Sequence, residues 1–147
     1  MKSAHLVLKN NREAFLYSNS LTKVNLWIVS GPYLRLNWRQ LNSEEKLKFI
    51  NEALKNSKTD IEKPSSFKDV GMELLKAYGF TKWSQLYKKA KLCYIDIKND
   101  NYIFTPSVYN SSNGGHEGIK DEIQTVCRDE SPEQIIMVLE RAIVKSL

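Results

Sequence analysis

The clearest structural signal in the chain is a β-hairpin. Residues 92–97 and 102–108 are rich in β-forming side chains, and Asn99-Asp100 separates them with a tight turn. Pro106 lies inside the second segment and cannot donate a main-chain hydrogen bond. It therefore predicts that the second strand lies at a sheet edge or is bulged there. The sheet that contains this hairpin is expected to be mainly antiparallel.

Strand signals also fill the first forty residues. Residues 5–8, 14–17 and 24–29 are rich in β-formers, and each segment is bounded by Asn, Ser or Gly. Ser30-Gly31-Pro32 predicts a turn after the third of them. Residues 122–127 alternate polar and apolar side chains, which is typical of a half-buried strand.

Helix signals occupy the middle and the end of the chain. Asn42 and Glu45 have the spacing of a capping box, although Ser43 could cap instead. A second helix is expected from Ser66 to Gly79, and a short one after a Thr81 cap. The last begins with Ser131, Pro132 and Gln134, which is a strong start signal. Residues 55–65 and 110–118 are polar and predict loops.

This order of elements favours α+β over a doubly wound parallel sheet. We expect a mainly antiparallel sheet with about four helices, in a single domain spanning residues 1–147. A chain of 147 residues has the usual size of one domain, and 41% hydrophobic residues can form a core. No apolar run approaches the length of a membrane span, and the N-terminus lacks a signal peptide, so the expected location is the cytoplasm. Cys93 and Cys127 are expected as free thiols.

The net charge of +5 is unevenly distributed. Residues 1–100 contain 18 Lys+Arg and 10 Asp+Glu, whereas residues 101–147 contain 4 and 7, so the balances are +8 and −3. The basic part could attract nucleic acid or an acidic partner. The basic and aromatic stretch 33–39 could likewise stack on bases. We favour solvated helix faces for the lysines and core or interface positions for the aromatics.

No catalytic motif is present. The chain has no phosphate-binding loop, no HExxH and no GxSxG, and Cys127 has no adjacent histidine. A two-histidine acid–base site with His5 and His116 is conceivable, but His5 is expected to be structural or simply exposed. We therefore predict a protein that is not an enzyme and has no metal, cofactor or small-molecule substrate.

A family resemblance indicates what such a protein could bind. The sequence resembles the immunity proteins of bacterial contact-dependent growth inhibition systems. The resemblance lies in core positions and turns rather than in a chemical signature. The residues that carry it are 20–27, 83–91, 93–97, 102–106, Asn113-Gly114-Gly115, 131–134 and 142–146.

The resemblance implies a cytoplasmic protein that binds the toxic C-terminal domain of a large exported protein. Most such toxins are nucleases, and immunity comes from stoichiometric binding that covers the active site or the substrate path. The expected assembly is therefore a heterodimer, with no part played by a membrane or by nucleic acid. A nucleic-acid-binding module that uses the basic N-terminal two thirds is the alternative function.

The toxin-binding surface is expected in the C-terminal third. Inhibitors of basic nucleases are commonly acidic, because complementary charge speeds capture, and this third carries the acidic excess. Its polar, glycine-rich loop could carry recognition or could simply join two strands. The candidate contact residues are Tyr109, Asn113, His116, Glu117, Asp121 and Glu122.

Overall fold

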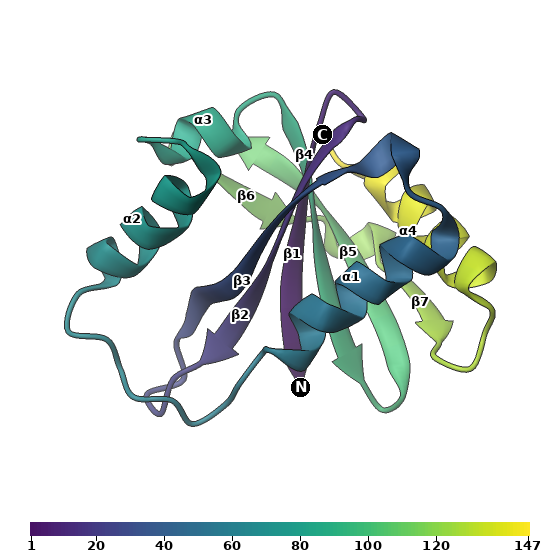
Figure 1. The fold of residues 1–147 in the computed structure, drawn as a ribbon, viewed down its shortest axis with the longest axis horizontal. Coiled ribbons are helices and arrows are strands. Elements are labelled where there is room, and N and C mark those ends of the chain that lie inside the picture. Colours follow the sequence, from purple (N-terminus) through teal and green to yellow (C-terminus); the bar gives the residue numbers. More distant parts are fainter.

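The computed structural model describes residues 1–147 and confirms an α+β fold built on one mainly antiparallel sheet. Seven strands and four helices make up the fold, with two short 3-10 helices (Figure 1). In chain order, the elements are β1 (Lys2–Lys9), β2 (Glu13–Leu21), β3 (Trp27–Asn37), η1 (Trp38–Gln40), α1 (Ser43–Lys55), α2 (Phe67–Tyr78), α3 (Trp83–Tyr87), β4 (Ala90–Lys98), β5 (Asn101–Asn110), β6 (Gly115–Gly118), η2 (Lys120–Glu122), β7 (Gln124–Cys127) and α4 (Pro132–Lys145).

Strand β1 lies in the middle of the sheet. The strand order is β3-β2-β1-β4-β5-β6, and β7 pairs with the other half of β5. All these strand pairs are antiparallel, and Leu6 faces Leu16 on β2 and Cys93 on β4. Because side chains alternate along a strand, Leu6 and Val7 point to opposite faces, and both are fully buried.

The two faces of the sheet are covered unequally. Helices α1 and α4 cover one face, where Leu6, Leu16, Ile50 and Leu139 belong to a core of 20 buried residues. Helices α2 and α3 cover the other face with a core of nine residues, which includes Val7, Phe15 and Leu74. On that second face, the positions nearer the start of β1 are left without a helix over them.

The local helix signals are confirmed. The Asn42 side chain accepts a hydrogen bond from the N–H of Glu45, and Glu45 in turn accepts one from the N–H of Asn42, so Asn42 is the cap rather than Ser43. Ser66 and Ser131 cap α2 and α4. Gly79 ends α2 in the left-handed conformation, with φ of 81°. Cys93 and Cys127 are both free thiols.

Two predictions about turns and loops are wrong. No turn occurs at Ser30-Gly31-Pro32, because β3 runs through it to Asn37 and absorbs the irregularity in a register shift opposite Tyr17 and Ser18. Residues 110–118 are not all loop, because β6 forms there and pairs with β5. Tertiary pairing decides both cases, since only a neighbouring strand can satisfy these main-chain groups.

Three further boundaries differ from expectation. Pro106 is not at a sheet edge; it lies in the gap where β5 changes outer partner from β7 to β6, a position at which no N–H is required. The start of the predicted strand 122–127 belongs to η2, so β7 begins only at Gln124. Helix α3 is capped at Lys82 rather than Thr81, and the Gln85 side chain accepts from the N–H groups of both.

We expect the smaller core to be essential for stability. Replacing Leu74, a fully buried residue of α2, by alanine should lower the free energy of unfolding by about 2–5 kcal/mol through lost burial and a residual cavity. Urea denaturation followed by circular dichroism measures this change. Met72→Ala on the exposed side of the same helix is the control and should cost well under half as much. Equal losses in the two variants would contradict the packing described for α2.

Candidate functional site

The glycine-rich segment after β5 is an ordered hairpin. Tyr109 pairs with His116, and Asn110 pairs with Gly115. At the tip, the Asn113 side chain accepts a hydrogen bond from the N–H of Gly115 at 2.9 Å, and the Asn110 amide donates to Glu117 at 3.1 Å. The side chains that suggested a mobile loop are therefore used to fix its shape.

His116 is tied to the scaffold through both ring nitrogens. Its Nδ1 lies 2.9 Å from the Ser107 hydroxyl, and its Nε2 lies 3.1 Å from the main-chain carbonyl of Tyr87. The ring also packs on Tyr87 and Tyr109, each at a centroid distance of 5.4 Å. Burial lowers the pKa of His116 below its usual range. The neutral His116 ring, hydrogen-bonded through both nitrogens, therefore links β6 to β5 and to the α3–β4 segment.

The six candidate contact residues divide into two groups. Tyr109, Asn113, His116 and Glu117 lie together on the β5–β6 hairpin. Asp121 and Glu122 are on η2, which is anchored where Ile119 donates its N–H to the Pro106 carbonyl. Pro106 and Asn110 are four positions apart on β5, or about 13 Å along the strand.

The acidic residues of the C-terminal third follow one side of the sheet. Six of the seven lie on β6, on η2, after β7 and at the start of α4, and none of these six forms an ion pair within the chain, whereas Glu140 pairs with Lys46. We call this set the acidic edge; it consists of Glu117, Asp121, Glu122, Asp129, Glu130 and Glu133. The predicted acidic face is therefore a strip along strand β5 rather than a compact patch.

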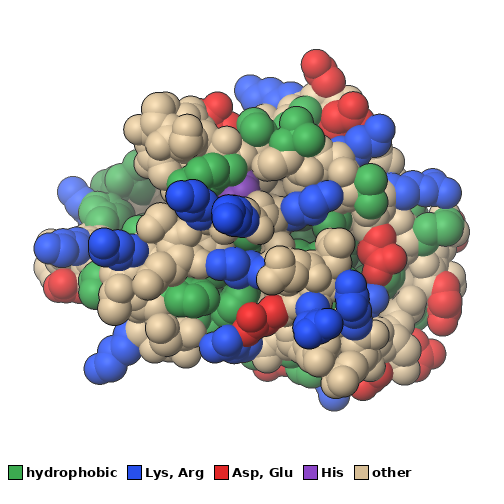
Figure 2. Space-filling model, turned by 90° about the horizontal axis from the view of Figure 1, so that it is seen from above, with side chains coloured by type: hydrophobic (Ala, Val, Ile, Leu, Met, Phe, Trp, Pro, Cys, Tyr) green, Lys and Arg blue, Asp and Glu red, His purple; other side chains and the backbone are tan.

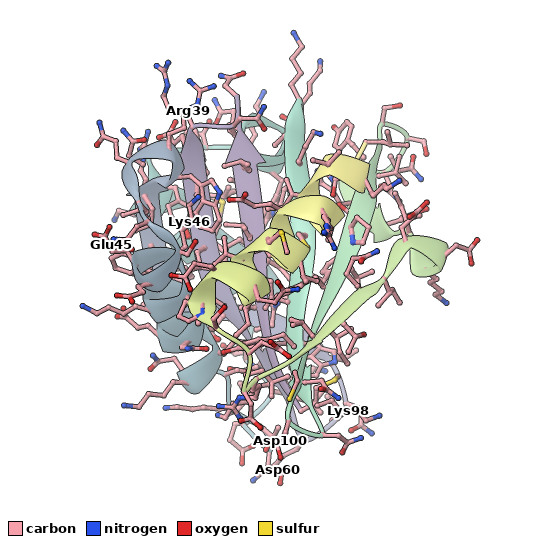
Figure 3. The ribbon with its side chains drawn as sticks, turned by 90° about the vertical axis from the view of Figure 1, so that its right-hand side faces the viewer. Arg39, Glu45, Lys46, Asp60, Lys98 and Asp100 are labelled. Carbon is pink, nitrogen blue, oxygen red and sulfur yellow. The ribbon has the colours of Figure 1, made fainter.

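Basic side chains gather at one end of the sheet. Antiparallel pairing brings the end of β1, the β1–β2 turn, η1 and the start of β4 together there, and Figure 2 shows Lys and Arg across this end. In Figure 3, Arg39 lies at this end and Lys98 and Asp100 lie at the opposite one. The basic end consists of six residues without an ion pair: Lys9, Arg12, Arg39, Lys88, Lys89 and Lys91.

The structure joins His5 to the cluster around His116. His5 Nδ1 lies 3.1 Å from the Tyr17 hydroxyl, which lies 2.7 Å from the hydroxyl of Tyr87. Tyr94 packs edge-on against His5 and donates a hydrogen bond to the carbonyl of His116 at 2.8 Å. Burial, and secondarily the charge of a protonated His116, lower the pKa of His5 to about 3. Two histidines 111 positions apart in the sequence thus share one hydrogen-bonded aromatic cluster.

Beside this cluster the uncovered part of the sheet forms a hollow of about 400 Å³, which we call the open-face hollow. Its lining comes from β1, β2, β3 and β4 and consists of Met1, Ser3, His5, Asn19, Trp27, Val29, Tyr94 and Asp96. None of these residues is among the contact residues predicted from the sequence: His5 was expected to be structural or exposed, and Trp27 and Tyr94 to be core or interface aromatics. Polar side chains at alternate positions of an otherwise apolar strand, such as Ser3 and His5, are the signal that could have indicated it.

No helix is long and apolar enough to cross a membrane. No group of three or more His, Cys, Asp or Glu side chains converges in a way that could hold a metal ion.

The buried histidines predict a loss of stability in mild acid. The unfolded chain binds a proton on His5 near pH 6.5 and the folded protein only near pH 3, so stability is complete above about pH 6.5 and declines as the pH falls. For His5 alone, the free energy of unfolding can fall by at most about 1.4 kcal/mol per pH unit, and the actual slope is smaller because His5 borders the hollow. The raised pKa of Asp96 acts in the opposite sense at lower pH, so urea titrations between pH 7 and 5.5 isolate the histidines. His5→Gln should reduce the slope, and an unchanged slope would contradict this assignment.

Comparisons with known proteins agree on the fold. No family model and no curated protein matches the chain. A solved protein of unknown function from Neisseria meningitidis is 18% identical, with 99% of this chain and 95% of that chain covered and a TM-score of 0.76. A chain of the CdiA-CT/CdiI toxin and immunity complex from Yersinia pseudotuberculosis is 14% identical, with 99% and 97% covered and a TM-score of 0.76. The protein therefore has, over almost its whole length, the fold found in that toxin and immunity complex, as the resemblance predicted.

Proposed function

We propose that this protein is an immunity protein, which binds and neutralises the toxic C-terminal domain of a contact-dependent growth inhibition toxin. The observation that carries the proposal is the match to a chain of a toxin and immunity complex, with a TM-score of 0.76 over 99% of this chain. The site geometry supports a binding role: the two histidines are engaged in the scaffold and have lowered pKa values, so neither is poised for acid–base catalysis.

Neutralisation by binding needs a rigid surface that covers part of the toxin. Helices α1 and α4 brace the sheet from one side, and the β5–β6 hairpin is fixed by its own hydrogen bonds. A preorganised surface loses little conformational entropy when it binds. In this proposal the complex is a cytoplasmic heterodimer, the chain is no enzyme, and the toxin is a nuclease whose active site or substrate path is blocked.

The charge distribution fits capture of a basic nuclease along the acidic edge. Six carboxylates that form no ion pair follow this side of the sheet, from β6, near the basic end, to the start of α4. Their field would attract a cationic protein and raise the association rate. The net charge of +5 does not oppose this, because charges beyond a Debye length of about 8 Å are largely screened at physiological salt.

Coexpression with a toxin domain tests the function. The toxin domain to use is the C-terminal domain of the exported protein whose reading frame adjoins the one encoding this chain. Its expression alone should arrest growth, and coexpression of this chain should restore growth to that of uninduced cells. The two purified proteins should elute together as a 1:1 complex in size-exclusion chromatography.

Growth arrest that persists during coexpression, with no complex formed, would overturn the proposal. The alternative, a nucleic-acid-binding module, is favoured by the gathering of six unpaired basic residues at one end of the sheet. If the protein does not bind the toxin but does bind RNA or DNA, with an affinity that falls steeply as the salt concentration rises, that alternative would be established instead.

Charge reversal at the acidic edge tests where the toxin docks. Replacing Glu117, Asp121 and Glu122 by lysine should weaken toxin binding and reduce its dependence on salt, because attractive charge is lost. Isothermal titration calorimetry at two salt concentrations measures both effects. The matched control replaces three exposed glutamates on other helices, Glu44, Glu52 and Glu73, by lysine and therefore changes the net charge equally. An affinity that stays equal to that of the wild type in the first variant would exclude this docking edge.

A further inference from the structure

We infer that the open-face hollow receives a basic side chain, preferentially arginine, from the protein that this chain binds. The inference rests on the proposed function and names a second contact, separate from the acidic edge. It rests on the residues that line the hollow and on two of their polar groups, one without a hydrogen-bond partner and one without an ion-pair partner within the chain.

The hollow exists because the helical cover of the sheet is incomplete. The buried residues under α2 and α3 include Val7, Phe15 and Tyr17. Further along the same strands, Ser3 and Asn19 face no helix and border the hollow instead. The sheet therefore provides a rigid floor that is open on one side.

Asn19 has an unsatisfied hydrogen-bonding group at this floor. Its side chain lines the hollow, the residue is only 4% exposed, and its Nδ2 has no hydrogen-bond partner. An unpaired buried amide destabilises the folded protein, because it has lost its hydrogen bonds to water. A guest that offers an acceptor, such as a main-chain carbonyl of a docked segment, would remove this penalty.

The hollow also contains a carboxylate without an ion-pair partner. Asp96 is its one carboxylate, is half-buried and forms no ion pair. His5 beside it is neutral near pH 7, because burial lowers its pKa. Burial raises the pKa of Asp96, and the Ser3 side chain and the N-terminal ammonium group of Met1 act against this rise. The ammonium group makes no ion pair with this carboxylate. A guest cation would complete the pair in a partly desolvated site.

Aromatic rings line the hollow together with the carboxylate. Tyr94 lines the hollow next to Asp96, and Trp27 lies on its rim with 42% of its surface exposed. Aromatic faces attract cations, and a planar guanidinium can stack on a ring while it pairs with a carboxylate. Arginine meets both conditions, whereas the compact, strongly hydrated ammonium of lysine meets them less well.

The surroundings favour a protein over a small molecule. Trp27 continues into Val24 and Leu26, which are 53% and 48% exposed on the β2–β3 turn. A small ligand in the hollow would leave these apolar side chains in water, whereas a protein surface would cover them. A buried arginine surrounded by aromatic and apolar contacts is a common arrangement at the centre of protein interfaces.

The test compares Asp96→Asn with Asp100→Asn in calorimetric binding to the toxin domain used above. The first change removes the charge in the hollow without changing its size. The second removes an exposed carboxylate on the β4–β5 turn, where the side chain is 92% accessible. Asp96→Asn should weaken binding by at least about tenfold at an unchanged melting temperature, as for an interface hot spot, and Asp100→Asn by less than about twofold. Equal affinities for wild type and Asp96→Asn would overturn the inference.

A second measurement is independent of the toxin. The peptide acetyl-Gly-Arg-Gly-amide is titrated into isotopically labelled protein, and the side-chain amide of Asn19 and the indole N–H of Trp27 are followed by NMR. Both signals should shift with this peptide, but not with a matched peptide in which neutral citrulline replaces arginine. Absence of any shift, or equal shifts with the two peptides, would also overturn the inference. Failure of wild type to bind the toxin would instead count against the proposed function.

Discussion

Strand β1 has to be covered on both of its faces, and the rest of the structure depends on this constraint. It pairs with β2 along one edge and with β4 along the other, so two long antiparallel ladders satisfy the main-chain groups along both edges. Its side chains alternate between two apolar layers, with Leu6 in the larger core and Val7 in the smaller. A central strand of this kind is stable only if helices shield both faces from water.

The unequal cover of the two faces separates support from recognition. Helices α1 and α4 complete one side and hold the sheet rigid. Helices α2 and α3 cover only part of the other, and the sequence of the strands adapts to this: β1 carries Val7 under the helices but Ser3 and His5 beyond them. The same strand thus contributes to a core and to an open, polar surface, and this surface is available to a partner.

Charge is segregated by topology rather than by sequence blocks. The basic residues come from the end of β1, the β1–β2 turn, η1 and the start of β4, which antiparallel pairing gathers at one end of the sheet. The acidic residues are close in sequence, but β6, η2 and β7 spread them along β5. A cationic partner would therefore meet an attractive strip along one side and a single carboxylate, Asp96, in the hollow. Such an arrangement can specify orientation as well as attraction.

Local chemistry made much of the fold predictable from the sequence alone. The Asn42–Glu45 capping box, the Gly79 helix end, the Asn99-Asp100 hairpin and the Ser131 cap act within a few residues, so their patterns fix the element without reference to the rest of the chain. The α+β class followed from their order. The fold resemblance was also visible in core and turn positions, since these are the positions that a shared backbone constrains.

Only the tertiary structure decided the features that depend on distant partners. Strand β3 continues through Gly31-Pro32 because β2 lies beside it, and β6 forms because β5 offers an unpaired edge beyond Pro106. His5 and His116 share a cluster because β1 and β6 both approach β4 and its tyrosine. The sequence predicted candidate contact residues that lie on the hairpin and on η2. It did not indicate the hollow around Asn19 and Asp96, because four strands contribute to it. Short-range patterns in the sequence determined the elements, whereas strand pairing over long sequence separations determined which side chains meet.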